Sequence, residues 1–261
     1  MKKARQLKRI ARSRLKGRYW QTVVIGLMVN AVGIITSTYN VCSMYSAYLA
    51  SGEDFMTFLS NYRNTSSSAF SSLMFLLSVA TFPLFLGWAL YNVKLIREEE
   101  PAFSDVISGY SYFLEYLALM FYRAVLVALW GAVFLVPAVI FGTLMDASSL
   151  VLLGFLGSVL ICLYKIASYA MADYLMVDQK YAPTEAVKLS KELMRGKIWK
   201  FTVLNLSFIG YFLLLPFTLG IGIVFLFPYL SAAVAAFYED ARQVSPGLHL
   251  EAPTEEVFHV E

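Results

Sequence analysis

Histidine is almost missing from this sequence, and that absence limits its chemistry. The two histidines, His249 and His259, both lie in the polar C-terminal stretch. Hydrolytic centres of the Ser-His-Asp and Cys-His kinds need an imidazole beside the nucleophile, so none can be assembled in the apolar part of the chain. Glycine-rich loops of the kinds that bind dinucleotides or nucleoside triphosphates are also missing. We therefore expect no enzymatic activity and name no catalytic residue.

Cysteine is equally scarce, with only Cys42 and Cys162. Two cysteines match none of the ligand spacings of structural zinc sites. Cys162 falls inside an apolar run and Cys42 follows a different one, so a disulfide between them is not expected. The sequence predicts no metal and no cofactor.

Charge is the third scarcity, and it excludes an ordinary soluble domain. Charged residues make up 15% of the chain and apolar residues 59%, against about 25% and roughly 45–50% in soluble proteins. Six apolar runs are long enough to cross a bilayer as helices. They lack the alternation of barrel strands, and backbone groups in lipid must be paired within a helix. The runs cover residues 19–39, 69–93, 113–141, 149–176, 199–217 and 219–238.

We therefore predict an all-α polytopic membrane protein, with six transmembrane helices in three hairpins. The last two runs meet in a tight turn near Thr218. The first run follows a basic start but has no small-residue cleavage site, so it is expected to stay as a signal anchor.

The orientation follows from lysine and arginine. Nine of the 21 lysines and arginines lie in residues 1–18, and the connection between the fourth and fifth runs is also basic. The 40–68 loop carries only Arg63, and the 142–148 turn carries none. Positive loops stay inside, so both termini are expected to be cytoplasmic in a protein of the cell membrane.

The expected organisation has three parts. They are a basic amphipathic interfacial helix over 1–18, a six-helix membrane domain over 19–241 with its external loop at about 40–68, and a mobile cytoplasmic tail over 242–261.

One six-residue pattern occurs twice, as "LKGRYW" over 15–20 and as "MRGKIW" over 194–199. An apolar stripe at helical spacing precedes each copy, which predicts an amphipathic helix on the membrane surface. Gly17 and Gly196 are expected to end these helices in the left-handed conformation. Trp20 and Trp199 are expected at headgroup depth. The basic residues predicted to meet lipid phosphates are Lys16, Arg18, Arg195 and Lys197.

We call each copy an elbow: a surface helix, a glycine turn and the start of a membrane helix. Ser104 and Thr184 resemble each other as helix N-caps followed by an acid. These internal similarities predict a divergent repeat of three units, each an interfacial helix plus a membrane hairpin. The simpler alternative is that many membrane helices begin with basic residues, glycine and tryptophan.

Three charged residues fall inside or beside the apolar runs: Arg123, Lys165 and Asp173. Charge is costly in lipid and often marks a functional site. One interpretation joins the three in an intramembrane polar site, as a transporter or channel would need. In the other, the two cations extend to the phosphates of the inner leaflet, and Asp173 pairs with one of them.

Four stretches resemble a family of bacterial, mostly Gram-positive, membrane proteins known as domain of unknown function 975. They are "APTEAVKLSKELMRGKIWKFTVLNLSFIGYFLLL" (182–215), "GIGIVFLFPYLSAAVAAFYEDAR" (220–242), "ARSRLKGRYW" (11–20) and "PAFSDVISGY" (101–110). The resemblance implies a multi-helix protein of the cell membrane with no established activity. The family usually has Ile-Pro-Gly late in the third helix, where this chain has Val136-Pro137-Ala138, so helix packing is expected to differ there.

The leading hypothesis is a non-enzymatic membrane protein that engages lipid of the anionic inner leaflet or a partner, either another membrane protein or a second copy. Nucleic acid is not an expected partner, because the basic N-terminus carries an apolar stripe and leads into a membrane helix. The alternative is a small-solute transporter or channel that uses the intramembrane charges.

Overall fold

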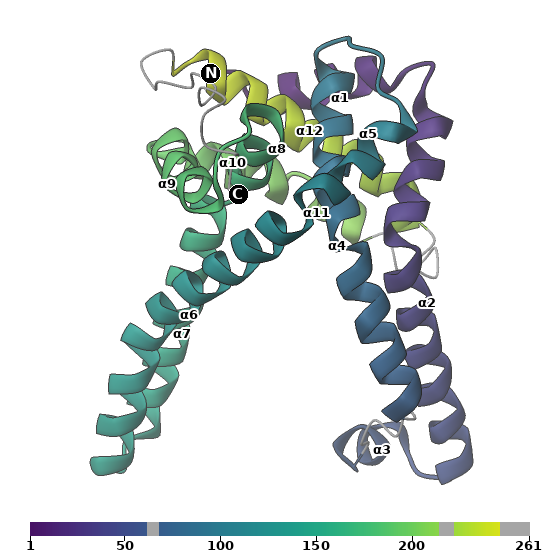
Figure 1. The fold of residues 1–261 in the computed structure, drawn as a ribbon. Coiled ribbons are helices and arrows are strands. Elements are labelled where there is room, and N and C mark those ends of the chain that lie inside the picture. Colours follow the sequence, from purple (N-terminus) through teal and green to yellow (C-terminus); the bar gives the residue numbers. More distant parts are fainter. Residues whose placement is uncertain (62–67, 214–221, 246–261) are drawn as a thin grey trace, which may run out of the picture.

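Two pairs of long helices diverge from a common cap in the computed structural model, which describes residues 1–61, 68–213 and 222–245 (Figure 1). We call each pair a leg. The first leg contains α2 (Tyr19–Ser51) and α4 (Ser68–Ile96), and the second contains α6 (Phe113–Leu144) and α7 (Ser148–Ser168). Helix α3 (Phe55–Asn61) lies at the tip of the first leg. All regular structure in these ranges is helical.

The cap gathers the remaining helices at one end of the molecule. They are α1 (Ala4–Leu15), α5 (Phe103–Ile107), the 3-10 helix η1 (Ser108–Tyr112), α8 (Ala172–Gln179), α9 (Pro183–Met194), α10 (Ile198–Leu206), α11 (Ile209–Phe212) and α12 (Gly222–Gln243).

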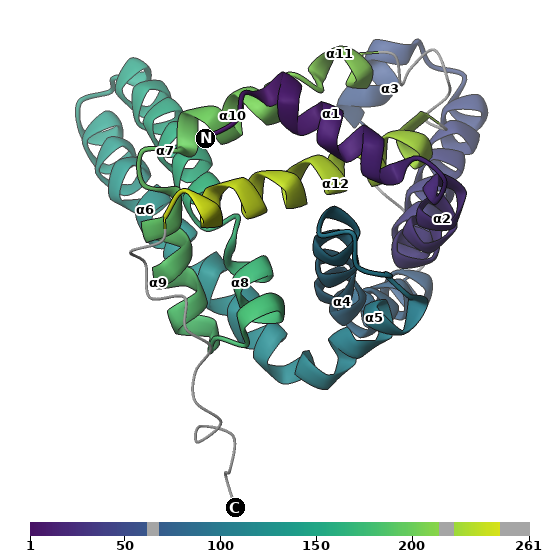
Figure 2. The ribbon, with the colours of Figure 1, turned by 90° about the horizontal axis from the view of Figure 1, so that it is seen from above.

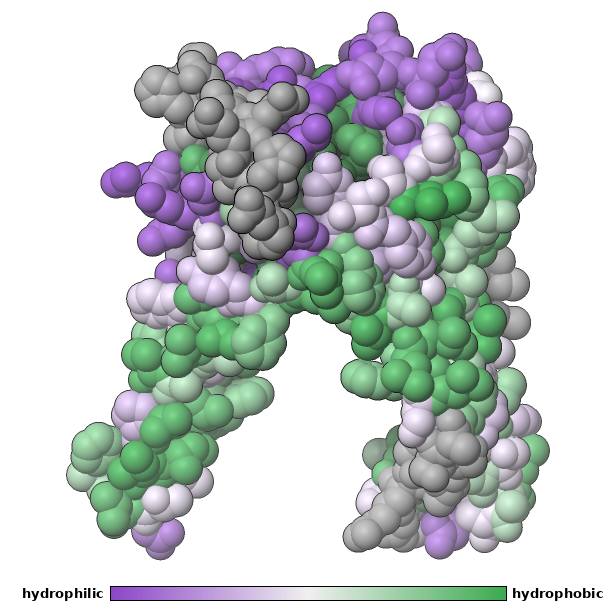
Figure 3. Space-filling view, in the orientation of Figure 1, coloured by the Kyte–Doolittle hydropathy of each residue, from purple (hydrophilic) through white to green (hydrophobic). Residues whose placement is uncertain are grey.

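The legs are apolar and the cap is polar, and the two colours separate clearly in Figure 3. Five helical stretches of the described chain are long and apolar enough to cross a membrane. This is the build of a multi-pass, all-helical membrane protein. The five are Tyr19–Ser51, Phe70–Ile96, Phe103–Leu144, Ser148–Gln179 and Gly222–Gln243.

The sequence predicts that the first apolar run ends at residue 39, but the helix in the structure is longer. Helix α2 continues to Ser51 and stops where Gly52 adopts a φ of 64°, a left-handed conformation that glycine closes helices with. No proline or glycine interrupts 40–51, so the backbone hydrogen bonds simply continue. Much of the expected 40–68 loop is therefore helix, and its residues 62–67 lie outside the described chain.

The fifth run, 199–217, is not one long helix either. It divides into α10 and α11, with a break at Ser207 and Phe208. The Ser207 hydroxyl donates to the Leu204 carbonyl at 2.6 Å, a local bond that competes with the helix ladder. The described part of the chain thus has five spanning candidates where six were expected. The predicted turn near Thr218 and residues 246–261 of the predicted tail lie outside it.

Two predicted helix starts shift by a residue or two. Helix α5 begins after Ala102, and the Asp105 carboxylate accepts the Ala102 backbone N–H at 2.8 Å, so Ser104 is not the cap. Helix α9 begins at Pro183 rather than after Thr184. Proline suits the first helical position, since the N–H that it lacks would be unpaired there anyway.

The apolar stripe of α1 faces protein. Leu7, Ala11 and Leu15 are buried, and α1 packs along α12 and against α4. Figure 2 shows α1 and α12 side by side across the cap. Helix α12 supplies a surface rich in buried alanine, which allows close approach. The expectation that this stripe lies in lipid is therefore wrong, because α12 covers it.

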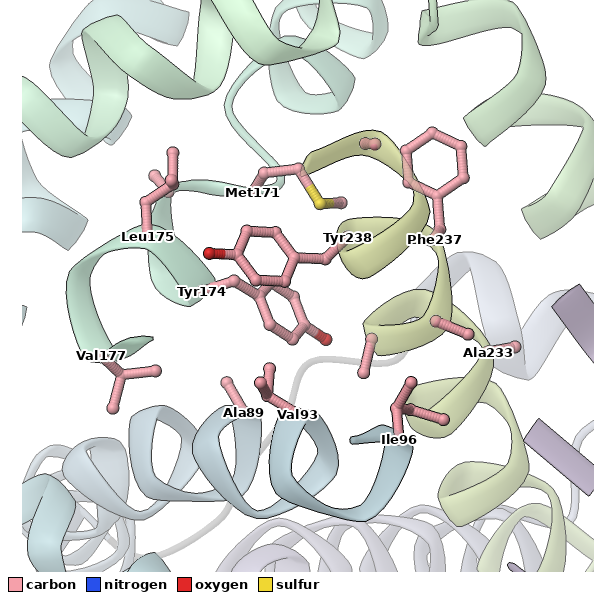
Figure 4. Close-up of a cluster of buried hydrophobic side chains, with 14 of the residues drawn as sticks. Ala89, Val93, Ile96, Met171, Tyr174, Leu175, Val177, Ala233, Phe237 and Tyr238 are labelled. Carbon is pink, nitrogen blue, oxygen red and sulfur yellow. The ribbon is translucent and has the colours of Figure 1, made fainter. Parts of the chain in front are cut away.

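The core of the cap joins both legs (Figure 4). Tyr174 of α8 stacks on Tyr238 of α12 with ring centroids 5.2 Å apart. Val93 of α4 and Met171, before α8, are buried in the same cluster. Each such side chain contributes roughly 1.5–3 kcal/mol through burial. The cap is therefore the part of the fold that determines how the legs are held.

Within the second leg, small residues bring α6 and α7 together. A Cβ on Gly154 would stand 1.9 Å from the Ala138 Cβ, so only glycine fits there. Gly157 likewise faces Phe134. The small face of Gly154 and Gly157 thus permits the close helix packing that is common in membrane proteins. Ala138 is accommodated because its neighbour Gly154 has no side chain.

Candidate functional site

The first elbow is a type II β-turn between two helices. Lys16 has φ −62° and ψ 123°, and Gly17 has φ 92°. The Arg18 N–H donates to the Leu15 carbonyl at 3.1 Å, which closes the turn. The second helix starts at once, since Thr22 N–H donates to the Arg18 carbonyl at 3.0 Å. A type II turn requires positive φ at its third residue, the position that Gly17 occupies.

The second elbow repeats this geometry. Arg195 has φ −58° and ψ 123°, and Gly196 has φ 72°. The Lys197 N–H donates to the Met194 carbonyl at 2.9 Å. A Cβ on Gly17 or Gly196 would meet no atom within 4 Å. Conformation, rather than space, therefore requires glycine at both positions.

The two elbow tryptophans are among the most exposed large side chains. Trp20 is 68% exposed and Trp199 is 76% exposed. Trp20 makes an edge contact with Phe225, with centroids 6.1 Å apart. Trp20 begins the apolar leg helix α2, so its uncovered indole has the placement of an interfacial anchor, whereas Trp199 lies on α10 of the cap.

The elbow cations differ in what they contact. Arg18 pairs with Glu100 at 3.6 Å. The Lys197 ammonium donates to the Ala241 carbonyl at 2.9 Å and to Ser245 Oγ at 2.5 Å, and burial lowers the pKa of Lys197. Lys197 is therefore bound by the protein itself, whereas Lys16 and Arg195 are exposed.

A cavity of about 790 Å³ opens beside the first elbow, between α1, α11 and the starts of α2 and α12. We call it the cationic pocket. Arg9, Arg12 and Lys16 of α1 form its basic side. Its other walls are aromatic and apolar, and include Tyr19, Tyr211, Phe225, Leu226 and Tyr229.

Six of the cations on α1 and its flanks form two groups that differ in what they contact. Lys2, Arg14 and Arg18 each pair with a carboxylate of a neighbouring element. Arg9, Arg12 and Lys16 have no carboxylate partner within residues 1–61, 68–213 and 222–245. Because residues three, four and seven apart share a helix face, these three cations form one row. Three cations of α1 and its C-terminal end that have no carboxylate partner thus line the pocket.

Sequence reasoning missed a buried ionic cluster in the cap. The Asp178 carboxylate of α8 accepts from both terminal nitrogens of Arg97, at 2.5 and 2.7 Å. It also accepts from the Tyr238 hydroxyl at 2.8 Å and from Arg242 at 2.9 Å. The side chain of Asp178 is only 4% exposed. The cluster ties the end of α4 to α8 and α12.

Arg97 completes the cluster by contacting Glu239 through its Nε at 2.7 Å. Burial opposes the charge of Arg97, but its hydrogen bonds to Asp178 and Glu239 raise its pKa above the ordinary value. Two cations face two anions, so the formal charges of the cluster cancel. The arrangement suits a structural clamp. The one available sequence signal is Asp178 itself, an acid two residues after the predicted apolar run 149–176.

The three intramembrane charges do not form one site. Arg123 of α6 pairs with Asp173 of α8 at 3.2 Å, which is one of the pairings that the sequence left open. The Arg123 guanidinium also contacts the Met120 sulfur at 3.3 Å. The two charges therefore neutralise each other where the second leg meets the cap.

Lys165 has a separate environment. Its ammonium lies 3.7 Å from the centre of the Trp130 ring, and the residue is 8% exposed. A cation over an indole face is attracted by the ring quadrupole. Within the described ranges no ion pair or hydrogen bond joins Lys165 to Arg123 or Asp173.

The described residues also contain no group of three or more histidine, cysteine or acidic side chains that could hold a metal ion. Comparison with known families shows that a family described as "Protein of unknown function (DUF975)" matches residues 1–245. No curated protein matches the chain. No solved structure matches it either.

Proposed function

The chain belongs to the DUF975 family of proteins of unknown function, and on that premise we propose that it is a non-enzymatic protein of the cell membrane whose cap engages anionic lipid. The observation that carries the proposal is the row of unpaired cations on α1, beside the exposed Trp20. Each lysine or arginine near an anionic surface contributes about 1 kcal/mol of attraction. Indole anchors add a preference for headgroup depth.

In this proposal the cap is cytoplasmic. The N-terminus lies in it (Figure 1), and so do the basic helix α1 and the basic residues Arg195, Lys197 and Lys200 that follow α9. The leg tips, with α3 and the α6–α7 turn, are then external. The positive-inside rule favours this orientation.

We infer the number of membrane crossings from the direction of each helix. Helices α2, α4, α6 and α7 run along the legs, while α12 runs across the cap (Figures 1 and 2). Half of the most apolar window of α12 is buried in protein. Four crossings, with α10 to α12 on the cytoplasmic side, bring the cap helices back to one face. This replaces the six crossings that apolar length alone predicts.

We also infer an internal repeat from the elbows. Lys16 and Arg195 share nearly the same φ and ψ, and a glycine at positive φ follows each. The third expected unit differs, since η1 leads directly into α6 without such a glycine. The support therefore covers two units.

The transport alternative has weaker support. It needs Lys165, Arg123 and Asp173 around one polar path. However, Arg123 and Asp173 pair with each other, and the Lys165 ammonium lies over the Trp130 ring. None of the three residues lines the cationic pocket.

Native mass spectrometry of the full chain, gently extracted from its own membrane, tests the proposal. We expect phospholipid adducts enriched in anionic classes relative to the membrane. A bare protein, or adducts that mirror the bulk lipid composition, contradicts lipid engagement. A co-retained protein without lipid shows instead that the cap engages a partner.

A further inference from the structure

The cationic pocket has too much positive charge for a single phosphodiester. Arg9 and Lys16 are seven residues apart, so the row extends about 10 Å along α1. Arg12 lies between them on the same face. One phosphodiester carries one negative charge and is a compact group. Two phosphates joined by a short bridge match the length of the row and neutralise two of its three positive charges.

The opposite walls of the pocket are suited to the glycerol and acyl parts of a lipid. Phe225 and Leu226 of α12 are apolar. The Tyr19 hydroxyl donates to the Phe225 carbonyl at 2.9 Å, and the Tyr229 hydroxyl donates to the Lys8 carbonyl at 3.4 Å. These bonds fix two aromatic rings at the pocket wall. Amphipathic rings of this kind are favoured between headgroups and acyl chains.

The size and place of the pocket agree with this occupant. Its volume of about 790 Å³ falls within the 300–1,000 Å³ typical of small-molecule sites. It lies at the elbow, where Lys16 belongs to the basic segment and Tyr19 begins an apolar leg helix. A free inorganic anion would leave the apolar walls uncovered.

We propose that this pocket binds one phospholipid that carries two phosphate groups, of the diphosphatidylglycerol class. This inference rests on the proposed lipid engagement and deepens it. Arg9, Arg12 and Lys16 pair with the two phosphates. The aromatic and apolar walls hold the glycerol and the first part of the acyl chains.

The test compares matched variants of the full chain. The pocket variant combines Arg9→Gln, Arg12→Gln and Lys16→Gln. The control variant combines Lys188→Gln, Lys191→Gln and Lys200→Gln. These control lysines are also exposed cations, but they lie on α9 and α10 away from the pocket. Each protein is reconstituted in nanodiscs of phosphatidylcholine with either diphosphatidylglycerol or phosphatidylglycerol, and native mass spectrometry counts the retained lipid.

We expect wild type and control to retain one diphosphatidylglycerol molecule in preference to phosphatidylglycerol. The pocket variant should lose this affinity by on the order of a hundredfold, because three phosphate contacts of about 1 kcal/mol each are removed. Circular dichroism checks that the variant is folded. A charge-keeping variant, Arg9→Lys with Arg12→Lys, should retain most of the binding.

Four results would overturn the pocket assignment. Equal loss in the control variant means that charge anywhere on the cap suffices, and general lipid engagement then survives. Equal retention of phosphatidylglycerol refutes the two-phosphate requirement. Displacement of the lipid by millimolar inorganic phosphate shows a site for free anions. Wild type without any retained anionic lipid contradicts the pocket and the proposed function together.

Discussion

Arg97 donates from both terminal nitrogens of its guanidinium to the Asp178 carboxylate, at 2.5 and 2.7 Å. Arg97 follows the last turn of α4 in the first leg, and Asp178 lies on α8, which continues from the second leg. The pair therefore connects the two legs directly. Because the side chain of Asp178 is almost fully buried, the connection is shielded from water and salt.

Asp178→Asn should lower the free energy of unfolding by about 3 kcal/mol, because it leaves Arg97 and Arg242 without their shared anion. The measurement is the unfolding midpoint in mild detergent. Lys94→Gln serves as the control, since its pair with Asp105 is more exposed and should contribute less than about 1 kcal/mol. Equal losses for the two variants would show that the Arg97 cluster is not the clamp described above.

Gly17→Ala and Gly196→Ala should each cost about 1–2 kcal/mol, because alanine is strained at positive φ. Gly33→Ala is the matched control. Gly33 lies in a helix with no atom near its missing Cβ, so alanine should be neutral or stabilising there. Thermal unfolding of the three variants in one detergent gives the comparison. If the elbow variants unfold at the same temperature as Gly33→Ala, the turns do not need glycine.

Gly87→Ala should be more damaging than either elbow substitution. A Cβ on Gly87 would lie 2.0 Å from the Val106 carbonyl oxygen, so α4 and α5 would have to separate. Overpacking of this kind costs about 3 kcal/mol at the upper end of the usual range. The same melting experiment, again beside Gly33→Ala, measures the loss. A stability change no larger than that of Gly17→Ala would mean that α5 moves aside freely.

Lys165→Met and Trp130→Leu should be coupled, because the lysine ammonium lies over the indole ring. A double-mutant cycle of unfolding free energies should give a coupling of about 1 kcal/mol. The cycle of Lys165→Met with Asp173→Asn is the control and should give a coupling near zero. Coupling confined to this second cycle would restore the single polar site that a transporter needs.

The sequence predicts the elbows well because their geometry is local. Four consecutive residues make each turn, and Gly17 or Gly196 is conspicuous between basic neighbours. The ionic cluster is different, since Arg97 and Asp178 are 81 residues apart. Neither a helical period nor a motif connects them, so only the folded chain reveals the pair.

Amphipathic pattern predicts that a helix has a covered face, but not what covers it. The stripe of α1 over Leu7, Ala11 and Leu15 is real. Its partner is α12, more than 200 residues further along the chain. Apolar length has a similar limit, because it treats α12 as a crossing although its direction follows the cap. Such choices depend on tertiary packing, which local sequence does not encode.

The pairing of α1 with α12 also has a consequence for synthesis. Helix α1 leaves the ribosome long before its partner α12, which is the last described helix to appear. The backbone N–H of Lys2 then donates to Asp240 at 2.7 Å. Until α12 has been synthesised, the apolar side of α1 has no helix to cover it and must be covered by the lipid surface or a chaperone. The α6–α7 hairpin packs mainly on itself and can insert during elongation, so the cap is the part of this molecule that matures last.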